Sequence, residues 1–139
     1  MMEKRYCIDI GGVYYFSTES TLRKSPTLNA AIQQHSQEQE DIPLFVDRDG
    51  GIFHHVLYYL RNNSVPSLED SSYIEMLVVE AGYFGLRGME LQLSRQLSER
   101  ANSLTEMQRD IREMRFILEE SVLQHRNSRS TGKATHHIR

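Results

Sequence analysis

Three charged residues, Asp47, Arg48 and Asp49, stand together between two hydrophobic stretches of the sequence. Burying an unpaired charge is costly, so a buried carboxylate or guanidinium requires an opposite charge and hydrogen bonds as partners. Those partners can belong to the same fold or to a neighbouring copy of the chain. We expect the neighbouring copy, which makes this charged triplet a candidate for holding subunits together.

Other residues with reactive or metal-binding side chains do not form a recognisable site. His54 and His55 are adjacent on a helical pattern, so they point in different directions and cannot bind one metal as residues four apart would. The triplet begins like a calcium loop, but Gly51 and Tyr58 stand where the fifth and twelfth positions require oxygen ligands. Gly11 and Gly12 lack the remaining residues of a phosphate-binding loop. We predict no catalytic residue, no cofactor and no metal.

A strand, a turn and a buried helix must position the triplet. Leu44–Val46 is an apolar run too short for a helix, and Gly50 and Gly51 follow the triplet. We expect Asp49 to cap the next helix and Asn62 with Asn63 to end it in a left-handed conformation. The apolar residues that recur at helical spacing in this helix are Phe53, Val56, Leu57 and Leu60.

Upstream of the triplet, the sequence indicates a hairpin followed by short helices. Tyr6–Ile10 and Val13–Phe16 are β-branched and aromatic runs on either side of Gly11-Gly12, which can form a tight turn. Ser17 and Thr18 offer hydroxyls that can cap the next segment, and Pro26 suits the start of a second helix. The first half of the chain therefore combines a small sheet with helices.

Two further features lie on either side of the central helix. The stretch from Gln33 to Asp41 is polar and acidic, and we expect an exposed loop there. A helix that begins at Ser67, with Asp70 completing a capping box, is expected to continue to Ala81 and to stop at Gly82. The residues of the candidate partner-binding loop are Gln37, Glu38, Glu40 and Asp41.

A much longer helical pattern runs from about Met89 to Gln124. Its apolar residues settle into a seven-residue repeat, which is typical of a parallel coiled coil. The alternative is an amphipathic helix folded back on its own domain. Extra apolar residues at Ile117 and Val122 broaden the seam, which favours more than two strands. The predicted seam residues are Leu97, Leu104, Met107, Ile111, Met114 and Leu118.

Charge and hydropathy exclude several functional classes. The net charge is −3, but the tail from 125 to 139 holds four bases and no acid, so residues 1–124 carry 12 bases against 19 acids, or −7. A nucleic-acid-binding role for the folded part is therefore disfavoured. No apolar run is long enough to cross a membrane, and the first residues do not resemble a signal sequence, so we expect a cytoplasmic protein. The tail has too little apolar content to fold, and we expect it to be disordered.

The chain resembles the potassium-channel tetramerisation domain, a branch of the BTB/POZ superfamily. The residues that carry the resemblance, in order and at compatible spacing, are Ile8–Gly12, Phe16–Thr18, Ser20–Leu22, Pro26, Phe45–Gly50, Phe53, Val56–Arg61 and Glu80–Leu86. The resemblance implies an α+β fold, with a small sheet beside a helical bundle. We therefore predict a domain at residues 5–88, a helix or parallel coiled coil at 89–124 and a disordered basic tail at 125–139.

The resemblance also implies how the chain functions. Domains of this type pack side by side into rings, in which charged side chains commonly cross between neighbours. That would assign Asp47, Arg48, Asp49 and Arg61 to a self-association interface. The chain is more similar to the members of this branch without a channel pore, because the paired cysteines that hold zinc between channel subunits are absent and the only cysteine is Cys7.

We therefore predict a non-enzymatic scaffold that assembles with itself into a homo-tetramer or a homo-pentamer. Two alternatives remain open at this point. Some relatives recruit a cullin as substrate adaptors of a ubiquitin ligase, and others assemble channel subunits. No residue of this sequence singles out a cullin, and no membrane insertion is expected.

Overall fold

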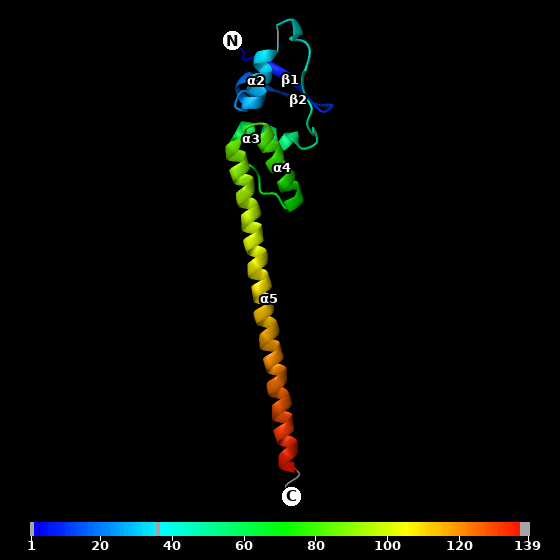
Figure 1. The fold of residues 1–139 in the computed structure, drawn as a ribbon, viewed down its shortest axis with the longest axis vertical. Coiled ribbons are helices and arrows are strands. Elements are labelled where there is room, and N and C mark those ends of the chain that lie inside the picture. The colour runs from blue at the N-terminus through cyan, green and yellow to red at the C-terminus, as the bar shows by residue number, and fades with distance from the viewer. Residues whose placement is uncertain (1, 36, 137–139) are drawn as a thin grey trace. The chain divides into compact units, whose positions relative to one another are not determined.

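The computed structural model describes residues 2–35 and 37–136, with side chains described to residue 129. Its elements form two compact units, Met1–Ser98 and Glu99–Arg139. The elements are, in chain order, β1 (Arg5–Ile10), β2 (Val13–Thr18), α1 (Glu19–Leu22), α2 (Pro26–Gln34), the 3₁₀ turn η1 (Gln37–Gln39), β3 (Leu44–Val46), α3 (Phe53–Asn62), α4 (Ser71–Tyr83) and α5 (Arg87–His136) (Figure 1). A small sheet beside a set of helices confirms the predicted α+β class.

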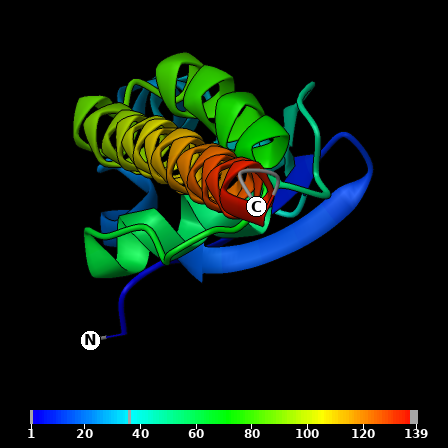
Figure 2. The same cartoon turned by 90° about the horizontal axis from the view of Figure 1, so that it is seen from below.

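The sheet has the strand order β2-β1-β3. β1 pairs antiparallel with β2 and parallel with β3, so that Ile10 lies between Val13 and Val46. The turn between β1 and β2 is formed as predicted by Gly11 and Gly12, with φ of 55° and 101°, a region of backbone space that suits glycine. Because β1 lies between β2 and β3, β2 is an edge strand, and Figure 2 shows it along the outside of the first unit.

Alternate residues of β1 face the helices and form the sheet's part of the core. Ile8 and Ile10 are fully buried there. At the centre of the core, the ring of Phe53 packs between Tyr15 and Phe84, with ring centroids 5.0 and 5.2 Å away. The helices contribute further buried residues, namely Leu22, Leu28, Val56, Leu60, Ile74, Leu77, Met89 and Leu93.

Side-chain caps begin three of the helices. Thr18 caps α1, and the Ser25 hydroxyl accepts a hydrogen bond from Leu28 N at 3.2 Å at the start of α2. The same hydroxyl, fully buried, donates to Phe84 O at 2.7 Å. Asp70 caps α4 by accepting from Ser72 N at 2.9 Å.

The boundaries of α3 and α4 correct three predictions. Asp49 does not cap α3, which begins after Ile52 without a side-chain cap. Ser67 does not start α4, because Asp70 itself is the cap and the helix begins one residue later. Gly82 does not stop α4, which continues to Tyr83, because a glycine inside a helix weakens it by only about 1 kcal/mol. The predicted end of α3 is confirmed, with Asn63 at φ 57°.

The first turns of α5 belong to the folded domain. Met89 and Leu93 are fully buried in its core, so the domain continues past the predicted boundary at residue 88. The side-chain amide of Gln92 accepts from Val65 N at 2.9 Å and donates to Asn63 O at 3.0 Å. Gln96 binds Leu68 N and the carbonyl oxygen of Pro66 in the same way, at 3.1 and 3.0 Å. These two glutamines hold the loop between α3 and α4.

Beyond the first unit, α5 is a helix whose side chains are exposed from Ala101 to Arg129. The sequence predicts an end at Gln124 and a disordered tail, whereas the structure continues the helix through residue 136. No proline interrupts this stretch, and adding a residue to an existing helix is easier than starting one. Residues 137–139 lie outside the described part of the chain. No helix among the described residues is long and apolar enough to cross a membrane.

Candidate interaction site

The segment 47–51, here called the charged turn, follows β3 and contacts the β1–β2 turn. Gly11 N donates to Val46 O at 3.0 Å, and the Tyr15 hydroxyl donates to Gly50 O at 2.5 Å. A side chain at Gly11 would collide with the backbone of Arg48, and one at Gly50 would collide with Ile10 O. The two glycines thus permit a close backbone approach that fixes the position of the charged turn.

Arg48 is held by residues of its own chain. Its Nε and Nη2 donate to the two carboxylate oxygens of Glu80 at 3.1 and 2.5 Å, a bidentate ion pair. Its guanidinium also stacks on the ring of Tyr83, 4.5 Å from the centroid. The hydrogen bonds with Glu80 raise the pKa of Arg48 above its ordinary value. Arg48 thus has an ion-pair partner within its own chain, and whether it also contacts a neighbouring copy stays a prediction.

Of the other three predicted interface residues, Asp47 and Asp49 flank Arg48 in the charged turn, and Arg61 lies elsewhere. Asp49 Oδ1 accepts from Gly51 N at 2.8 Å and so stabilises the charged turn itself. Asp47 is exposed. Arg61, also exposed, donates to Phe16 O at 3.1 Å near the opposite end of the sheet. The chain by itself does not bring Arg61 to the charged turn, and whether these four residues contact a neighbouring copy stays a prediction.

The two histidines of α3 serve the local structure. His54 Nδ1 lies 3.0 Å from Gly51 O, and His55 Nδ1 lies 2.6 Å from the Tyr73 hydroxyl. Burial, and then the neighbouring His54, lowers the pKa of His55, which favours the neutral ring. Across the described residues, no three His, Cys, Asp or Glu side chains are grouped closely enough to hold a metal ion.

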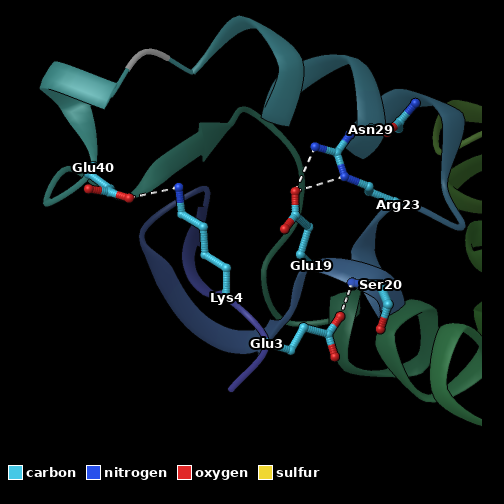
Figure 3. Close-up of polar contacts among 7 residues, drawn as sticks. All are labelled: Glu3, Lys4, Glu19, Ser20, Arg23, Asn29 and Glu40. Carbon is cyan, nitrogen blue, oxygen red and sulfur yellow. Dashed lines mark hydrogen bonds and ion pairs between the residues drawn. The ribbon is translucent and has the colours of Figure 1, made fainter. Parts of the chain in front are cut away.

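The candidate partner-binding loop includes η1 and is anchored on one side. Glu40 Oε1 and Lys4 Nζ form an ion pair at 2.9 Å, as Figure 3 shows. This contact lowers the pKa of Glu40 and raises that of Lys4. The remaining residues of the loop, Gln37, Glu38 and Asp41, are exposed. The loop thus presents an acidic surface whose position is tied to the strand that begins at Arg5.

Five of the six predicted coiled-coil residues are exposed, with exposed fractions between 51% and 63%. The sixth, Leu97, is partly buried against the core of the first unit. Leu97 thus contacts the domain, and whether it also takes part in a coiled-coil seam stays a prediction. The exposed seam residues are Leu104, Met107, Ile111, Met114 and Leu118.

Two exposed apolar surfaces of the first unit were not predicted. The first, here called the sheet face, consists of Tyr14, Phe16 and Phe45 on the side of the sheet that faces away from the helices. The second, here called the α4 stripe, consists of Met76, Val79 and Tyr83. Strand alternation and the spacing of three and seven residues on a helix were the signals that could have revealed them.

The chain is similar to one known protein family and to two relatives of known sequence. The family model described as the BTB/POZ domain matches residues 7–94. "Uncharacterized protein F47D12.3" of Caenorhabditis elegans is 47% identical over 53 residues, which cover 37% of this chain and 38% of that protein. "FH protein interacting protein FIP2" of Arabidopsis thaliana is 37% identical over 89 residues, covering 60% of this chain and 30% of that protein. The chain thus spans well under half the length of these relatives. Domains of the matched family associate with one another and with other proteins, and this chain belongs to the BTB/POZ family.

Proposed function

We propose that the chain is a non-enzymatic scaffold that assembles with itself, through its BTB/POZ domain and through a parallel coiled coil formed by α5. The observation that carries this proposal is the exposed seam of α5. Between Ala101 and Arg129 every side chain is exposed, and five large apolar residues recur there at heptad spacing. A helix with such a stripe and no core of its own gains most by packing against identical helices.

The charge pattern of α5 supports parallel association. With Leu104, Ile111 and Leu118 at the a positions, Asp110 falls at g and Arg115 at the following e. Parallel helices exchange salt bridges at this offset. Ile117 and Val122 add exposed apolar surface beside the seam and favour more than two helices. A tetramer or a pentamer meets this condition.

The domain and the coil reinforce each other. About three heptads of coiled coil are marginal when the helices meet only by diffusion. When several domains are already held together, the local concentration of their helices rises, and a short seam becomes sufficient. The scaffold would thereby display several copies of its exposed surfaces at once.

Replacing two seam residues by lysine, Leu104→Lys with Ile111→Lys, is expected to weaken assembly strongly. Each buried Leu or Ile side chain contributes about 1.5–3 kcal/mol, so the double variant should lower the association constant by more than about 100-fold. Sedimentation equilibrium over a range of concentrations measures this change.

The matched control is Asn102→Lys with Thr105→Lys, which adds the same charge outside the seam. Both positions are exposed and lie at f and b of the heptad. The control should retain the assembly of the original chain. An original chain that sediments as a single folded copy at high concentration contradicts the proposal, as does equal weakening by both pairs of lysines.

The exposed acidic loop favours recruitment of another protein as a second candidate function. Glu38 and Asp41 face solvent, while the pair of Glu40 with Lys4 fixes the loop. The adaptor role in a cullin-RING ubiquitin ligase is one form of such recruitment. A basic surface on the partner would complement these carboxylates.

Retention of a purified cullin N-terminal domain on the immobilised chain tests this second candidate. Recruitment through the loop predicts retention that Glu38→Lys with Asp41→Lys abolishes. Glu106→Lys with Glu113→Lys, which changes the same charge on α5, should leave it intact. No retention by the original chain removes the cullin adaptor and leaves the scaffold function.

A further inference from the structure

A small open cavity lies beside the end of β2, where residues of the hairpin, of α1 and of α3 come together. Its volume is about 320 Å³, near the lower end of the range for ligand sites. This size suits one small group rather than a large cofactor. The residues that line the cavity are Arg5, Phe16, Ser17, Thr18, Thr21 and Arg61. Two guanidinium groups and three hydroxyl groups thus surround a space that an anion can fill.

The two arginines of the cavity are available to a ligand. Arg5 is exposed and, within the described part of the chain, its side chain forms no ion pair and no hydrogen bond. Arg61 donates from Nη2 to Phe16 O at 3.1 Å, which uses one of its five N–H donors and holds the guanidinium at the cavity. None of the described residues that line the cavity is acidic. A ligand with two negative charges would therefore balance the two arginines.

Ser17 provides an independent indication of a ligand. It is only 8% exposed, yet among residues 2–35 and 37–129 its hydroxyl has no hydrogen-bond partner. A buried hydroxyl without a partner lowers stability, and such groups are rare in folded proteins. Every fully inaccessible polar side-chain atom of the described residues has a partner, so the Ser17 hydroxyl must be reachable from outside. Because Ser17 lines the cavity, a ligand bound there supplies the missing partner.

The start of α1 is already satisfied by the chain itself. Ser20 N donates to Glu3 Oε1 at 2.6 Å, as Figure 3 shows, and Thr21 N donates to Thr18 Oγ1 at 3.4 Å. The hydrogen bonds from Ser20 lower the pKa of Glu3, so this carboxylate is charged at neutral pH. A ligand in the cavity must therefore be held by the two arginines and by Ser17 rather than by the amides of α1.

We propose that this cavity binds the phosphoryl group of a phosphorylated serine on a partner protein. A phosphoserine carries a charge of about −1.5 to −2 at pH 7 and three strong acceptor oxygens. This matches two guanidinium groups and one hydroxyl donor, whereas a carboxylate offers one charge and two oxygens. The exposed ring of Phe16 can pack against a neighbouring residue of the bound segment. This proposal goes beyond self-assembly and does not depend on it.

The charge of the chain favours a protein segment over an anionic membrane. Residues 1–124 carry 12 bases against 19 acids, or −7, so a membrane of like charge is repelled as a whole. A flexible segment can place a single phosphate in the cavity without bringing a large negative surface close to the rest of the domain.

Fluorescence anisotropy of a labelled peptide tests the proposal on the full-length chain. The peptide carries one phosphoserine between alanines, and two comparison peptides carry serine or aspartate in its place. We expect the phosphopeptide to bind at least about tenfold more tightly than the aspartate peptide, because two charge-assisted contacts distinguish them. The serine peptide should not bind, and inorganic phosphate should displace the phosphopeptide.

Substitutions at the cavity locate the bound peptide. Arg5→Gln and Arg61→Gln should each weaken phosphopeptide binding by at least about tenfold. Ser17→Ala leaves the charge unchanged and should weaken binding by about three- to tenfold through the lost hydroxyl contact. The matched control is Arg112→Gln, which removes the same charge at an exposed position of α5 and should bind like the original chain. Arg5→Gln breaks no side-chain contact within the described residues, so it should keep the circular dichroism of the original chain.

Four results would overturn the proposal. The first is the absence of phosphopeptide binding, and the second is equal weakening by Arg5→Gln and Arg112→Gln, which would show attraction by net charge alone. The third is equal binding by Ser17→Ala and the original chain. The fourth is binding that depends on Arg5 to vesicles containing phosphatidic acid but not to the peptide, which would assign the cavity to a membrane.

Light scattering on the same samples separates this proposal from the proposed function. If the peptide does not bind and Arg5→Gln lowers the oligomeric mass, a carboxylate of a neighbouring copy occupies the cavity instead. If the peptide does not bind and the mass of every variant is that of an assembled original chain, the phosphoserine site is overturned and self-assembly stands. A monomeric original chain that binds the phosphopeptide supports the site and contradicts self-assembly.

Discussion

Arg48→Ala is expected to lower the free energy of unfolding by about 3–5 kcal/mol, because it leaves a buried carboxylate without its partner. The Glu80 side chain is only 9% exposed, and both of its oxygens accept hydrogen bonds from Arg48. The variant also loses the stacking of the guanidinium on Tyr83. Urea unfolding of the full chain at one fixed concentration measures the change, because assembly makes stability depend on concentration.

Two further variants identify the cause of this loss. Adding Glu80→Gln to Arg48→Ala removes the orphaned charge and should restore part of the lost stability. Asp47→Ala, next to Arg48 but exposed, should change the stability of the domain by no more than about 0.5 kcal/mol. If Arg48→Ala changes the oligomeric mass while the unfolding free energy stays constant, the ion pair with Glu80 is not what holds this residue.

Phe53→Ala is expected to cost about 3–5 kcal/mol of stability, the range observed when a large aromatic residue is removed from a core. The Phe53 side chain is 1% exposed and packs between the rings of Tyr15 and Phe84. Its loss opens a cavity between the sheet and the corner that joins α4 to α5. Thermal and urea unfolding, monitored by circular dichroism, measure the effect.

Tyr58→Ala is the matched control for this substitution. Tyr58 lies on the same helix and is also aromatic, but it is 43% exposed. Its replacement should cost clearly less than that of Phe53, and Phe53→Leu should lie between the two. An equal loss in Phe53→Ala and Tyr58→Ala would mean that the aromatic contacts with Tyr15 and Phe84 do not organise the core.

The elements that could be predicted are those with local signals in the sequence. Gly11-Gly12 between two β-branched and aromatic runs identified the hairpin, and Pro26 identified the start of α2. The buried face of α3 followed from its helical spacing, and its end followed from Asn63. In each case the residues that determine the conformation lie within a few positions of it.

The errors concern contacts between residues far apart in the sequence. Arg48 and Glu80 are separated by 32 residues, so the composition of the charged turn could not reveal that its partner lies on α4. The burial of the Glu80 carboxylate could not be predicted either, because the sequence alone does not distinguish a buried acidic residue from an exposed one. The sequence alone therefore could not show that Arg48 has a partner within its own chain.

The end of the domain was misplaced for a related reason. Leu93 and Leu97 fit a helical repeat equally well as parts of a core or of a coiled-coil seam, and only the packing of α5 against the domain separates the two. Gln92 and Gln96 gave no signal at all, since a glutamine on a helix is usually exposed. Their role depends on the loop that they meet.

The hydrogen bonds of Gln92 and Gln96 with the loop between α3 and α4 limit where α5 can be joined to another protein module. The loop between α3 and α4 takes its backbone hydrogen bonds from α5, so this part of α5 is not an interchangeable linker. A fusion that exchanges the helical segment for another assembly module must place its junction after Ser98. A junction at Gly88 would leave the loop's amide and carbonyl groups to water and would remove Met89 and Leu93 from the core.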